Sequence, residues 1–477
     1  MILAIDQGTT GTTCLVVDQG LHVVGRGYAE IARTFPEPGW VEQDPAGIWS
    51  SVEAAAGAAL ADAHVSAAQL DAIGITNQRE TTILWERATG RPVAPAIVWQ
   101  DRRTAERCRG LPAGLVRART GLVPDPYFSA TKLEWLLART DAPRDTLAFG
   151  TVDAWLVWNL TRGRVHATDR TNASRTMLYD IRALAWDDEL LALFGVDRAL
   201  LPEVVPSSGV VGEAELLDAT VPIAGIVGDQ QAALFGQGCF APGEAKATYG
   251  TGAFVLVNVG GDAGPAPEGL LKTVAAFAAG GEPQYAVEGS VLTSGSAVTW
   301  LRDGLGIVSG PEELERLAVE AGSTGGVTFV PALAGLGSPH WDADARGLIA
   351  GISGGTTRGH IARAALEGIA HQVADVLEAQ PGGVAVLRAD GGASRNAFLM
   401  QLQADLVGHP VEVVAEKEST AIGAAALAGL AVGVWKSAAE VAALVARGPT
   451  YEPSMPAAEV ASRRAEWRLA VARARLR

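Results

Sequence analysis

The sequence predicts an α/β protein with two domains. Strand-like and helical segments alternate along the chain, and 477 residues are more than one hydrophobic core usually organises. A Gly/Thr turn between two apolar runs also occurs twice, as Gly8-Thr9-Thr10-Gly11 and as Gly250-Thr251-Gly252. One such turn is commonly only a tight connection, but it can also bring N–H groups and hydroxyls close to an anion. Two of them, in different halves of the chain, suggest related domains that hold opposite ends of one nucleotide.

Apolar patterning assigns the elements of the first half. It predicts an antiparallel meander, a helix, and two strands around a polar segment: residues 3–5, 14–17 and 21–25, then 45–63, then 72–76 and 81–85 on either side of Asn77-Gln78-Arg79-Glu80. Residues 152–160 and 190–194 look helical, whereas residues 202–208 read as a loop. Residues 223–235 predict a strand, a turn and a helix, with Asp229 where the strand ends. Ligands of open α/β sheets bind at that edge.

The second half repeats this alternation after a boundary that we expect near residues 236–244, which contain Gly and Pro. Residues 384–390 predict a buried strand, and Gly391-Gly392 then leads into a helix with Leu399, Leu402 and Leu406 on one face. A Gly-Gly turn before a helix is either a tight connection or a seat for an anion or a purine edge. The Arg-rich segment 462–477 predicts a solvated helix.

Composition excludes several classes of partner and site. The net charge of −15 argues against nucleic acid or an anionic membrane as a partner. Three cysteines, Cys14, Cys108 and Cys239, cannot form a disulfide framework, and no Cys/His cluster has zinc spacing. The longest apolar run, residues 421–435, is shorter than the roughly 20 residues that span a bilayer. With no basic signal segment at the start, the chain is predicted to be cytoplasmic and not inserted in a membrane.

Two aspartates stand at positions where chemistry is expected. Asp6 precedes the first Gly/Thr turn, where it either caps its own loop or holds a Mg²⁺–water shell beside the phosphates. Asp229 either caps the helix that follows it or acts as a base for an attacking hydroxyl. Because an alcohol has a pKa far above neutrality, its proton must leave during transfer, and such a base contributes about 10²–10⁴-fold.

Other side chains could form a substrate site. Arg79-Glu80 is either a surface ion pair or a clamp in which Arg donates to, and Glu accepts from, neighbouring hydroxyls. Trp99, Tyr127 and Phe254 are either core residues or apolar walls for a small carbon skeleton. The seven histidines show no triad or metal spacing, so none is assigned to catalysis.

Longer motifs resemble those of the FGGY carbohydrate kinase family, and within it the glycerol kinases, over residues 2–470. The matching stretches are Ala4-Ile5-Asp6-Gln7-Gly8-Thr9-Thr10, residues 38–45, Gly74-Ile75-Thr76-Asn77-Gln78-Arg79-Glu80-Thr81-Thr82, residues 96–100, residues 125–129, residues 228–236, Thr248-Tyr249-Gly250-Thr251-Gly252, residues 347–352 and Asp390-Gly391-Gly392-Ala393. The resemblance implies an actin-like fold of two ribonuclease-H-like domains, residues 1–238 and 239–477, with ATP·Mg²⁺ in the cleft between them. The first domain would hold mainly the polyol and the second mainly the nucleotide.

The resemblance also implies an activity and a set of site residues. The γ-phosphoryl group of ATP would pass to a terminal hydroxyl of glycerol, giving sn-glycerol 3-phosphate and ADP, in a homo-oligomeric enzyme (dimer or tetramer). Asp229 would be the base, and Asp6 and Asp229 would lie at the metal. The implied glycerol contacts are Arg79, Glu80, Trp99, Tyr127, Asp229, Gln230 and Phe254. The implied nucleotide contacts are Thr9, Thr10, Gly250, Thr251, Gly295, Gly392 and Asn396.

The chain departs from the family pattern at several positions. Thr13 and Thr299 stand where the family usually has an arginine and a glutamine near the nucleotide, and Arg395 stands where a small residue is common. Residues 213–222 contain no Lys or Arg, so we expect no effector site for a sugar bisphosphate. No histidine occurs between His166 and His340, so a regulatory histidine is also not expected.

Two alternatives remain open at this stage. The chain could be a kinase for a longer polyol or a ketose, which a panel of acceptors would decide. It could instead be an actin-type ATP switch or scaffold, which would hydrolyse ATP at a rate indifferent to glycerol. The Asp229-Gln230 pair and the polyol clamp favour the enzyme.

Overall fold

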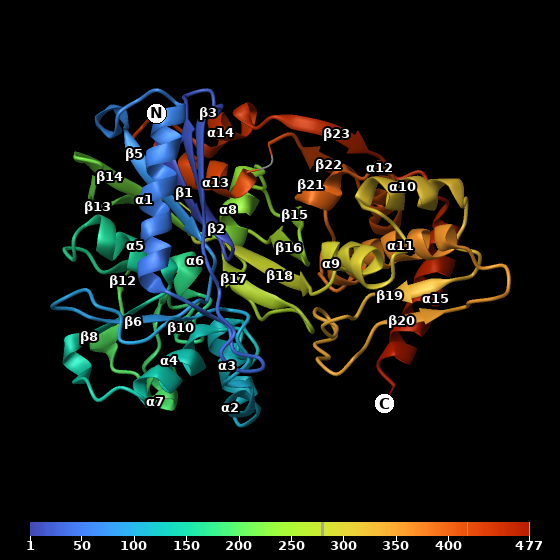
Figure 1. Cartoon of the computed structure of the whole chain (residues 1–477), viewed down its shortest axis with the longest axis horizontal. Helices are drawn as coiled ribbons and strands as arrows, with labels where there is room; N and C mark the ends of the chain where they lie inside the picture. Colours follow the sequence, from blue (N-terminus) through green and yellow to red (C-terminus); the bar gives the residue numbers. More distant parts are fainter. Residues whose placement is uncertain (278–280, 417, 477) are drawn as a thin grey trace.

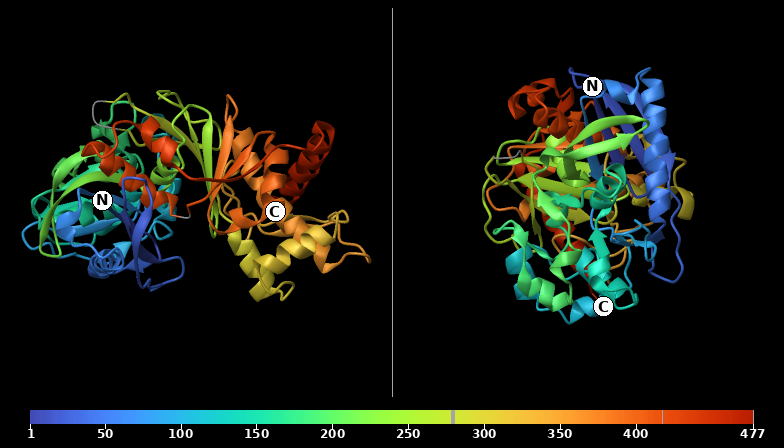
Figure 2. Two further views of the ribbon diagram at one scale, coloured as in Figure 1. Left: turned by 90° about the horizontal axis from the view of Figure 1, so that it is seen from above. Right: turned by 90° about the vertical axis from the view of Figure 1, so that its left-hand side faces the viewer.

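The computed structural model describes residues 1–277, 281–416 and 418–476, and it shows two lobes, each built on a mixed sheet (Figures 1 and 2). The first sheet has the strand order β3-β2-β1-β5-β14-β13. Its strands are β1 (Ile2–Gln7), β2 (Gly11–Val17), β3 (Val23–Glu30), β5 (Ala72–Asn77), β13 (Ser208–Leu216) and β14 (Ala219–Gly228). The second sheet has the order β17-β18-β16-β15-β21-β22-β23. Its strands are β15 (Glu244–Tyr249), β16 (Ala253–Asn258), β17 (Leu271–Val274), β18 (Tyr285–Val291), β21 (Val386–Asp390), β22 (Val411–Val414) and β23 (Arg447–Tyr451).

The two sheets share one topology, which confirms the predicted duplication. In the first, β1, β2 and β3 form an antiparallel meander, β5 and β14 run parallel to β1, and β13 is antiparallel at the edge. In the second, β15, β16, β18, β21, β22 and β23 take the same places and directions. Each Gly/Thr turn joins the first two strands of its sheet and is closed by a backbone hydrogen bond of 2.9 Å, from the Gly8 N–H to the Gly11 carbonyl in the first and from the Gly250 N–H to the Gly252 carbonyl in the second, which is one residue shorter.

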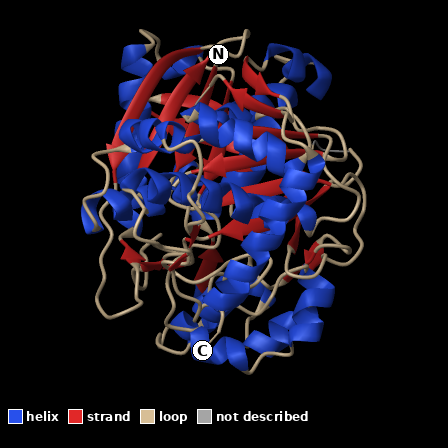
Figure 3. Ribbon diagram, turned by 90° about the vertical axis from the view of Figure 1, so that its right-hand side faces the viewer, coloured by secondary structure: helices blue, strands red, loops and turns tan. Residues whose placement is uncertain are grey.

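Helices cover the sheets and leave the strands inside (Figure 3). Helix α1 (Pro45–Asp62) starts where the predicted helix does: the Asp44 carboxylate accepts the Ala46 N–H, and Pro45 occupies the first turn. Its apolar face, with Ile48 and Val52, packs on β2 and β3. Gly27 on β3 permits this approach, since a Cβ there would lie 2.0 Å from the Ala55 carbonyl oxygen.

Two helices pack together where the lobes meet: α8 (Asp229–Gly236) and α13 (Ser419–Ala431) (Figure 1). Their contact depends on glycine, because a Cβ at Gly236 would lie 2.0 Å from the Ser419 carbonyl oxygen and one at Gly423 would lie 2.0 Å from that of Ala232. Helix α13 also packs on β14, β5 and β1, whereas α8 reaches β15 and β16 of the second sheet. The helix that begins at Asp229 is therefore held by both lobes.

Most of the predicted elements are confirmed, including helices α5 (Val152–Leu160) and α7 (Asp188–Phe194) and the strand-to-helix junction at Asp229. The predicted loop at residues 202–208 is wrong. It contains β12 (Glu203–Val205), which pairs with β9 (Ala167–Asp169), and β13 already begins at Ser208. Pro202 and Pro206 suggest a loop, but they flank the strand and do not belong to it. The strand itself contains two β-branched residues, Val204 and Val205.

The prediction of a solvated C-terminal helix is also wrong in part. Helix α15 (Ala457–Ala474) buries Trp467 and Arg464, whose guanidinium pairs with Asp375 at 2.5 Å and Glu378 at 2.8 Å. Arg477 lies outside the described residues. Among the helices that the structure describes, none is long and apolar enough to cross a bilayer.

Candidate active site

Asp229 lies at the junction of β14 and α8, and one of its two carboxylate oxygens has polar partners. Its Oδ1 accepts the Gln230 N–H at 2.6 Å and lies 3.1 Å from Arg79 Nε. Its Oδ2 has no hydrogen-bond or ion-pair partner among the described residues, and the side chain is 29% exposed. The cap position belongs to Gly228, so a capping role does not account for this carboxylate. The geometry leaves Oδ2 available to accept a proton.

Arg79 and Glu80 are buried, which makes the surface ion-pair interpretation wrong. Arg79 is 2% exposed and Glu80 is 1% exposed. Glu80 has a φ of 62°, a left-handed conformation that is costly for a residue with a Cβ. Its carbonyl accepts hydrogen bonds from the hydroxyls of Ser129 and Thr82, which help to hold this conformation. Strain of this kind concentrates at functional sites.

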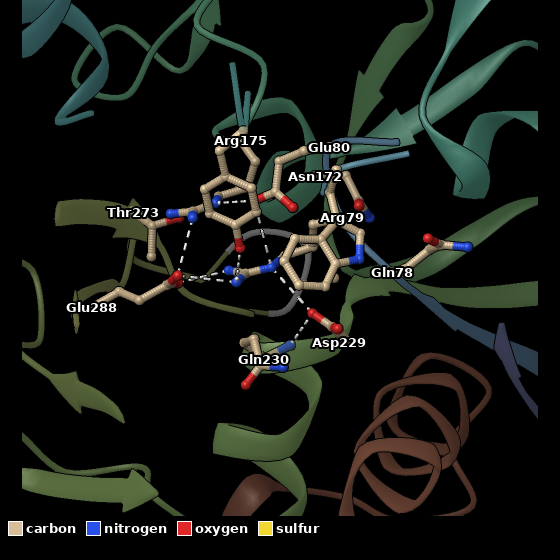
Figure 4. A network of polar contacts seen from close by, with 12 residues as sticks. Gln78, Arg79, Glu80, Asn172, Arg175, Asp229, Gln230, Thr273 and Glu288 are labelled. Carbon is tan, nitrogen blue, oxygen red and sulfur yellow. Dashed lines mark hydrogen bonds and ion pairs between the residues drawn. The ribbon is translucent and has the colours of Figure 1, made fainter. Parts of the chain in front are cut away.

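The Arg79 guanidinium belongs to an ionic cluster that spans both sheets (Figure 4). It donates two hydrogen bonds to Glu288 of β18, at 2.7 and 3.0 Å. Arg175 donates to Glu288 at 3.0 Å and to Glu80 at 2.7 Å. The clamp residues are thus anchored by a carboxylate from the second sheet.

Burial and ion pairing compete within this cluster. Burial opposes the ionisation of Glu288, but Arg175 and Arg79 outweigh it and lower its pKa to about 2. For Glu80, burial dominates and raises the pKa although the same two guanidiniums lie beside it. Glu288 is therefore the firmly ionised partner of the two arginines.

Three aromatic side chains form a wall beside the cluster. The Trp99 ring lies edge-on to Tyr127, with centroids 5.6 Å apart, and to Phe254, at 6.4 Å. All three side chains are half-buried, so they keep surface for a ligand and are not core residues. Trp99 Nε1 donates to the Thr9 hydroxyl at 2.9 Å, which joins the wall to the first Gly/Thr turn. Every residue expected to contact the polyol therefore lies in one neighbourhood.

The expected nucleotide contacts gather around the two turns. Thr9 and Thr10 lie in the first turn. In the second, the Gly295 N–H donates to the Gly250 carbonyl at 2.9 Å, and the Ser294 N–H donates to the Thr251 carbonyl at 3.0 Å.

Gly392 and Asn396 follow β21, which pairs with the strand leading into the second turn. A Cβ at the neighbouring Gly391 would lie 2.4 Å from the Tyr249 carbonyl oxygen. Asn396 Oδ1 accepts the Leu399 N–H at 2.7 Å and caps helix α12 (Ala397–Val407). Its Nδ2 is therefore the polar group left for a ligand.

Asp6 fits a magnesium site better than a loop cap. Its carboxylate has no partner among the described residues, and burial together with the charges of Asp229 and Glu418 raises its pKa well above the usual value. A bound cation would relieve the repulsion between these carboxylates. The described residues contain no group of three or more His, Cys, Asp or Glu that could hold a metal ion. A site with so few protein ligands suits Mg²⁺, since this ion is commonly bound by one or two carboxylates together with substrate phosphates.

Comparison with known proteins identifies the family. Family models for the FGGY family of carbohydrate kinases match both parts of the chain, the N-terminal domain over residues 1–236 and the C-terminal domain over residues 245–432. The chain belongs to this family. The match confirms the resemblance drawn from the sequence motifs. The model boundaries lie on either side of the expected division at residues 238 and 239, which stays a prediction.

The relatives of this FGGY kinase cover nearly its full length. It is 51% identical to a glycerol kinase of Rhodopirellula baltica over 99% of this chain and 90% of the relative. It is 53% identical to a glycerol kinase of Deinococcus radiodurans over 99% of this chain and 97% of the relative.

Solved structures agree. A Plasmodium falciparum glycerol kinase with ADP has a TM-score of 0.93 and 36% identity, covering 100% of this chain and 98% of that one. A xylulose kinase from Rhodospirillum rubrum has a TM-score of 0.86 and 25% identity, and the match covers 98% of this chain and 97% of that one. These similarities confirm the predicted two-domain α/β kinase fold.

Sequence reasoning missed three charged residues of this FGGY kinase site: Arg175, Lys246 and Glu288. Glu288 and Lys246 lie within strands whose other residues are mainly apolar and buried. A charge in such a strand is the available signal, because burying an ion is costly unless a partner meets it. Arg175 follows the short helix α6 (Arg170–Ala173) and carries no comparable local signal.

Proposed function

We propose that this FGGY kinase transfers the γ-phosphoryl group of ATP to a terminal hydroxyl of glycerol, producing sn-glycerol 3-phosphate and ADP. The observation that carries the proposal is the Asp229 carboxylate, with Oδ1 held by Arg79 and Oδ2 free, beside a buried polar clamp and an aromatic wall. The names of the full-length relatives support glycerol as the acceptor.

The clamp residues have complementary roles toward a small polyol. Arg79 can only donate hydrogen bonds, while the carboxyl groups of Glu80 and Asp229 offer acceptor oxygens, so adjacent hydroxyls meet donors and acceptors in turn. Trp99 and Phe254 cover the carbon skeleton. Glycerol has six heavy atoms, so even about −1.5 kcal/mol per atom limits its binding free energy to roughly −9 kcal/mol. Positioning must therefore come from a site that is already built, as the buried cluster is.

Asp229 would take the proton of the attacking hydroxyl as the O–P bond forms. The oxygen becomes acidic only during transfer, so a carboxylate within hydrogen-bond reach can take the proton at that moment. The N–H groups and hydroxyls of the two Gly/Thr turns would hold the phosphates. Asp6, with Asp229, would hold Mg²⁺, which neutralises charge on the phosphoryl oxygens when it is bound. In phosphoryl transfer, alignment and charge neutralisation provide most of the catalysis.

Closure of the two lobes would exclude water, the competing acceptor. The two Gly/Thr turns belong to different sheets, so a nucleotide that contacts both would hold the two lobes together. We expect small-angle scattering to show a smaller radius of gyration with glycerol and a non-hydrolysable ATP analogue together. An unchanged scattering curve would count against closure.

The deciding experiment is a coupled assay of ADP release with glycerol, xylulose and gluconate as separate acceptors. We expect turnover with glycerol far above that with the two sugar substrates. Faster turnover with a sugar would assign another FGGY activity. ATP hydrolysis indifferent to all three would support an ATP switch.

Three further expectations belong to the same proposal. We expect no inhibition by fructose 1,6-bisphosphate, since residues 213–222 carry no basic side chain; clear inhibition would refute this. We expect a homo-oligomer, which light scattering would measure. A cytoplasmic location stays a prediction, to be tested by cell fractionation.

A further inference from the structure

Lys246 is a buried cation at the candidate active site to which neither the sequence motifs nor the proposed reaction gives a role. It is one of five lysines among the 38 basic residues and is 0% exposed. It lies on β15, two residues before Thr248, and its ammonium donates to the Thr248 hydroxyl at 3.0 Å. It also donates to Gln230 Oε1, in the first turn of α8. The ammonium therefore joins the strand of the second Gly/Thr turn to the helix of the catalytic aspartate.

Charged groups from four elements face this ammonium. They are Asp390 at the end of β21, Asp229 at the start of α8, Arg79 after β5 and Glu288 on β18. Burial lowers the pKa of Lys246 to about 8, while Asp390 and Asp229 act in the opposite direction. Near neutral pH the ammonium is charged and compensated by carboxylates from both halves of the chain.

The hydrogen bond from Lys246 fixes how the Gln230 side chain is turned. An ammonium has three donors and no acceptor, so the amide atom that meets it must be the oxygen. The amide nitrogen, Nε2, then faces away from Lys246 and has no partner among the described residues. Gln230 is half-buried, so part of its side chain remains exposed next to the partly exposed Asp229. Without the ammonium, the amide could present either its oxygen or its nitrogen.

We propose that Lys246 is a positioning residue that makes Gln230 a hydrogen-bond donor toward the acceptor substrate, next to the Asp229 carboxylate. The donor would serve a hydroxyl oxygen of the polyol, while Asp229 accepts the proton of the hydroxyl that reacts. The same ammonium also donates to Thr248, on the strand that leads into the second Gly/Thr turn. The inference rests on the proposed acceptor chemistry, but it concerns how the donor is oriented.

A double-mutant cycle tests this inference. The variants are Lys246→Met, Gln230→Ala and the pair together, with Lys436→Met as a matched control at an exposed lysine. We expect each single change at the site to raise KM for the acceptor and lower kcat/KM by about tenfold or more. The pair should be no worse than Gln230→Ala alone, because Lys246 acts through Gln230. The control should match the wild type. Multiplied losses in the pair would overturn the inference.

The pH profile provides a second readout that a merely structural lysine would not give. In the wild type, kcat/KM should fall as pH rises through about 8, where the ammonium loses its charge. Lys246→Arg keeps the charge and the donors, so this variant should retain more activity than Lys246→Met and lose the alkaline fall. An identical fall in wild type and Lys246→Arg would overturn the inference. Lys246→Arg also decides the question where Lys246→Met fails to fold.

Failure of the proposed reaction can be told apart from failure of this inference. The wild type is first measured with glycerol, xylulose and gluconate. If a sugar is the better acceptor, the proposed reaction fails, and the cycle is then run with that sugar. The test of Lys246 compares each variant with the wild type on the same acceptor, so it still shows whether Lys246 acts through Gln230.

Discussion

Replacing Glu288 with glutamine tests whether the buried ionic cluster holds the site together. Glu288 is 0% exposed, and it receives three hydrogen bonds from Arg79 and Arg175. The substitution keeps the shape of the side chain but removes its charge. Both guanidiniums would then share one buried carboxylate, Glu80, together with the partly exposed Asp229.

Two independent arguments give the expected magnitude. Removing one partner of a buried ion pair costs about 3–5 kcal/mol, because the remaining charge stays uncompensated. The pKa of Glu288 is about 2 in the folded protein against an ordinary value of 4.5, which corresponds to about 3 kcal/mol of stabilisation near neutral pH. The sign follows from the lowered pKa. This stabilisation is complete above the ordinary value and is lost as pH falls through about 2.

Calorimetry and urea unfolding, followed by the fluorescence of the 12 tryptophans, measure the loss. A decrease of about 3 kcal/mol would lower the Tm by roughly 6–12 °C for a domain of this size. KM for glycerol should also rise, since Arg79 loses its main anchor. The control is Glu320→Gln, whose partner Arg316 is 53% exposed and whose loss should cost at most about 1 kcal/mol. Equal effects of Glu288→Gln and Glu320→Gln would refute the reasoning.

Three other changes test separate parts of the molecule. Asp229→Asn should keep glycerol affinity by calorimetry but lose at least about 10²-fold in kcat; near-normal turnover would remove Asp229 from the role of base. Asp6→Asn should raise the Mg²⁺ concentration for half-maximal rate by roughly tenfold, and chelation of the metal should abolish turnover; an unchanged Mg²⁺ dependence would exclude Asp6 from the metal site. Arg464→Met should destabilise the protein by about 3 kcal/mol, because Asp375 loses a buried partner. Arg468→Met, at a 62% exposed arginine, is its control, and equal unfolding midpoints would contradict this expectation.

The sequence predicted those features that local patterns determine. Apolar runs mark β1 and β2, and the glycines between them mark the turn that joins these strands. Asp229 could be placed because a buried strand ends one residue before it and a helix begins with it. Each of these features is decided within about ten residues, so one sequence contains the information.

The remaining features depend on groups that are distant along the chain. Whether Arg79 and Glu80 form a surface pair or a buried clamp is decided by Glu288, which lies more than 200 positions away. Arg464 was expected in water because its own helix is rich in arginine, but Asp375 and Glu378 from helix α11 (Arg358–Glu378) meet it. Charge patterns within a helix show which ions are present, but the fold determines which of them are paired.

Residues of the second sheet hold the side chains of the proposed polyol site in place. Glu288 anchors Arg79 through a buried contact, and the buried Lys246 orients the half-buried Gln230. Breaking the Glu288–Arg79 pair would leave uncompensated buried ions, so a motion of the lobes is expected to preserve it. The Gly/Thr turns are bound to each other by no such contact among the described residues. Closure that moves the turns while the clamp stays fixed would align the phosphate with an acceptor already held, which is what catalysis by positioning requires.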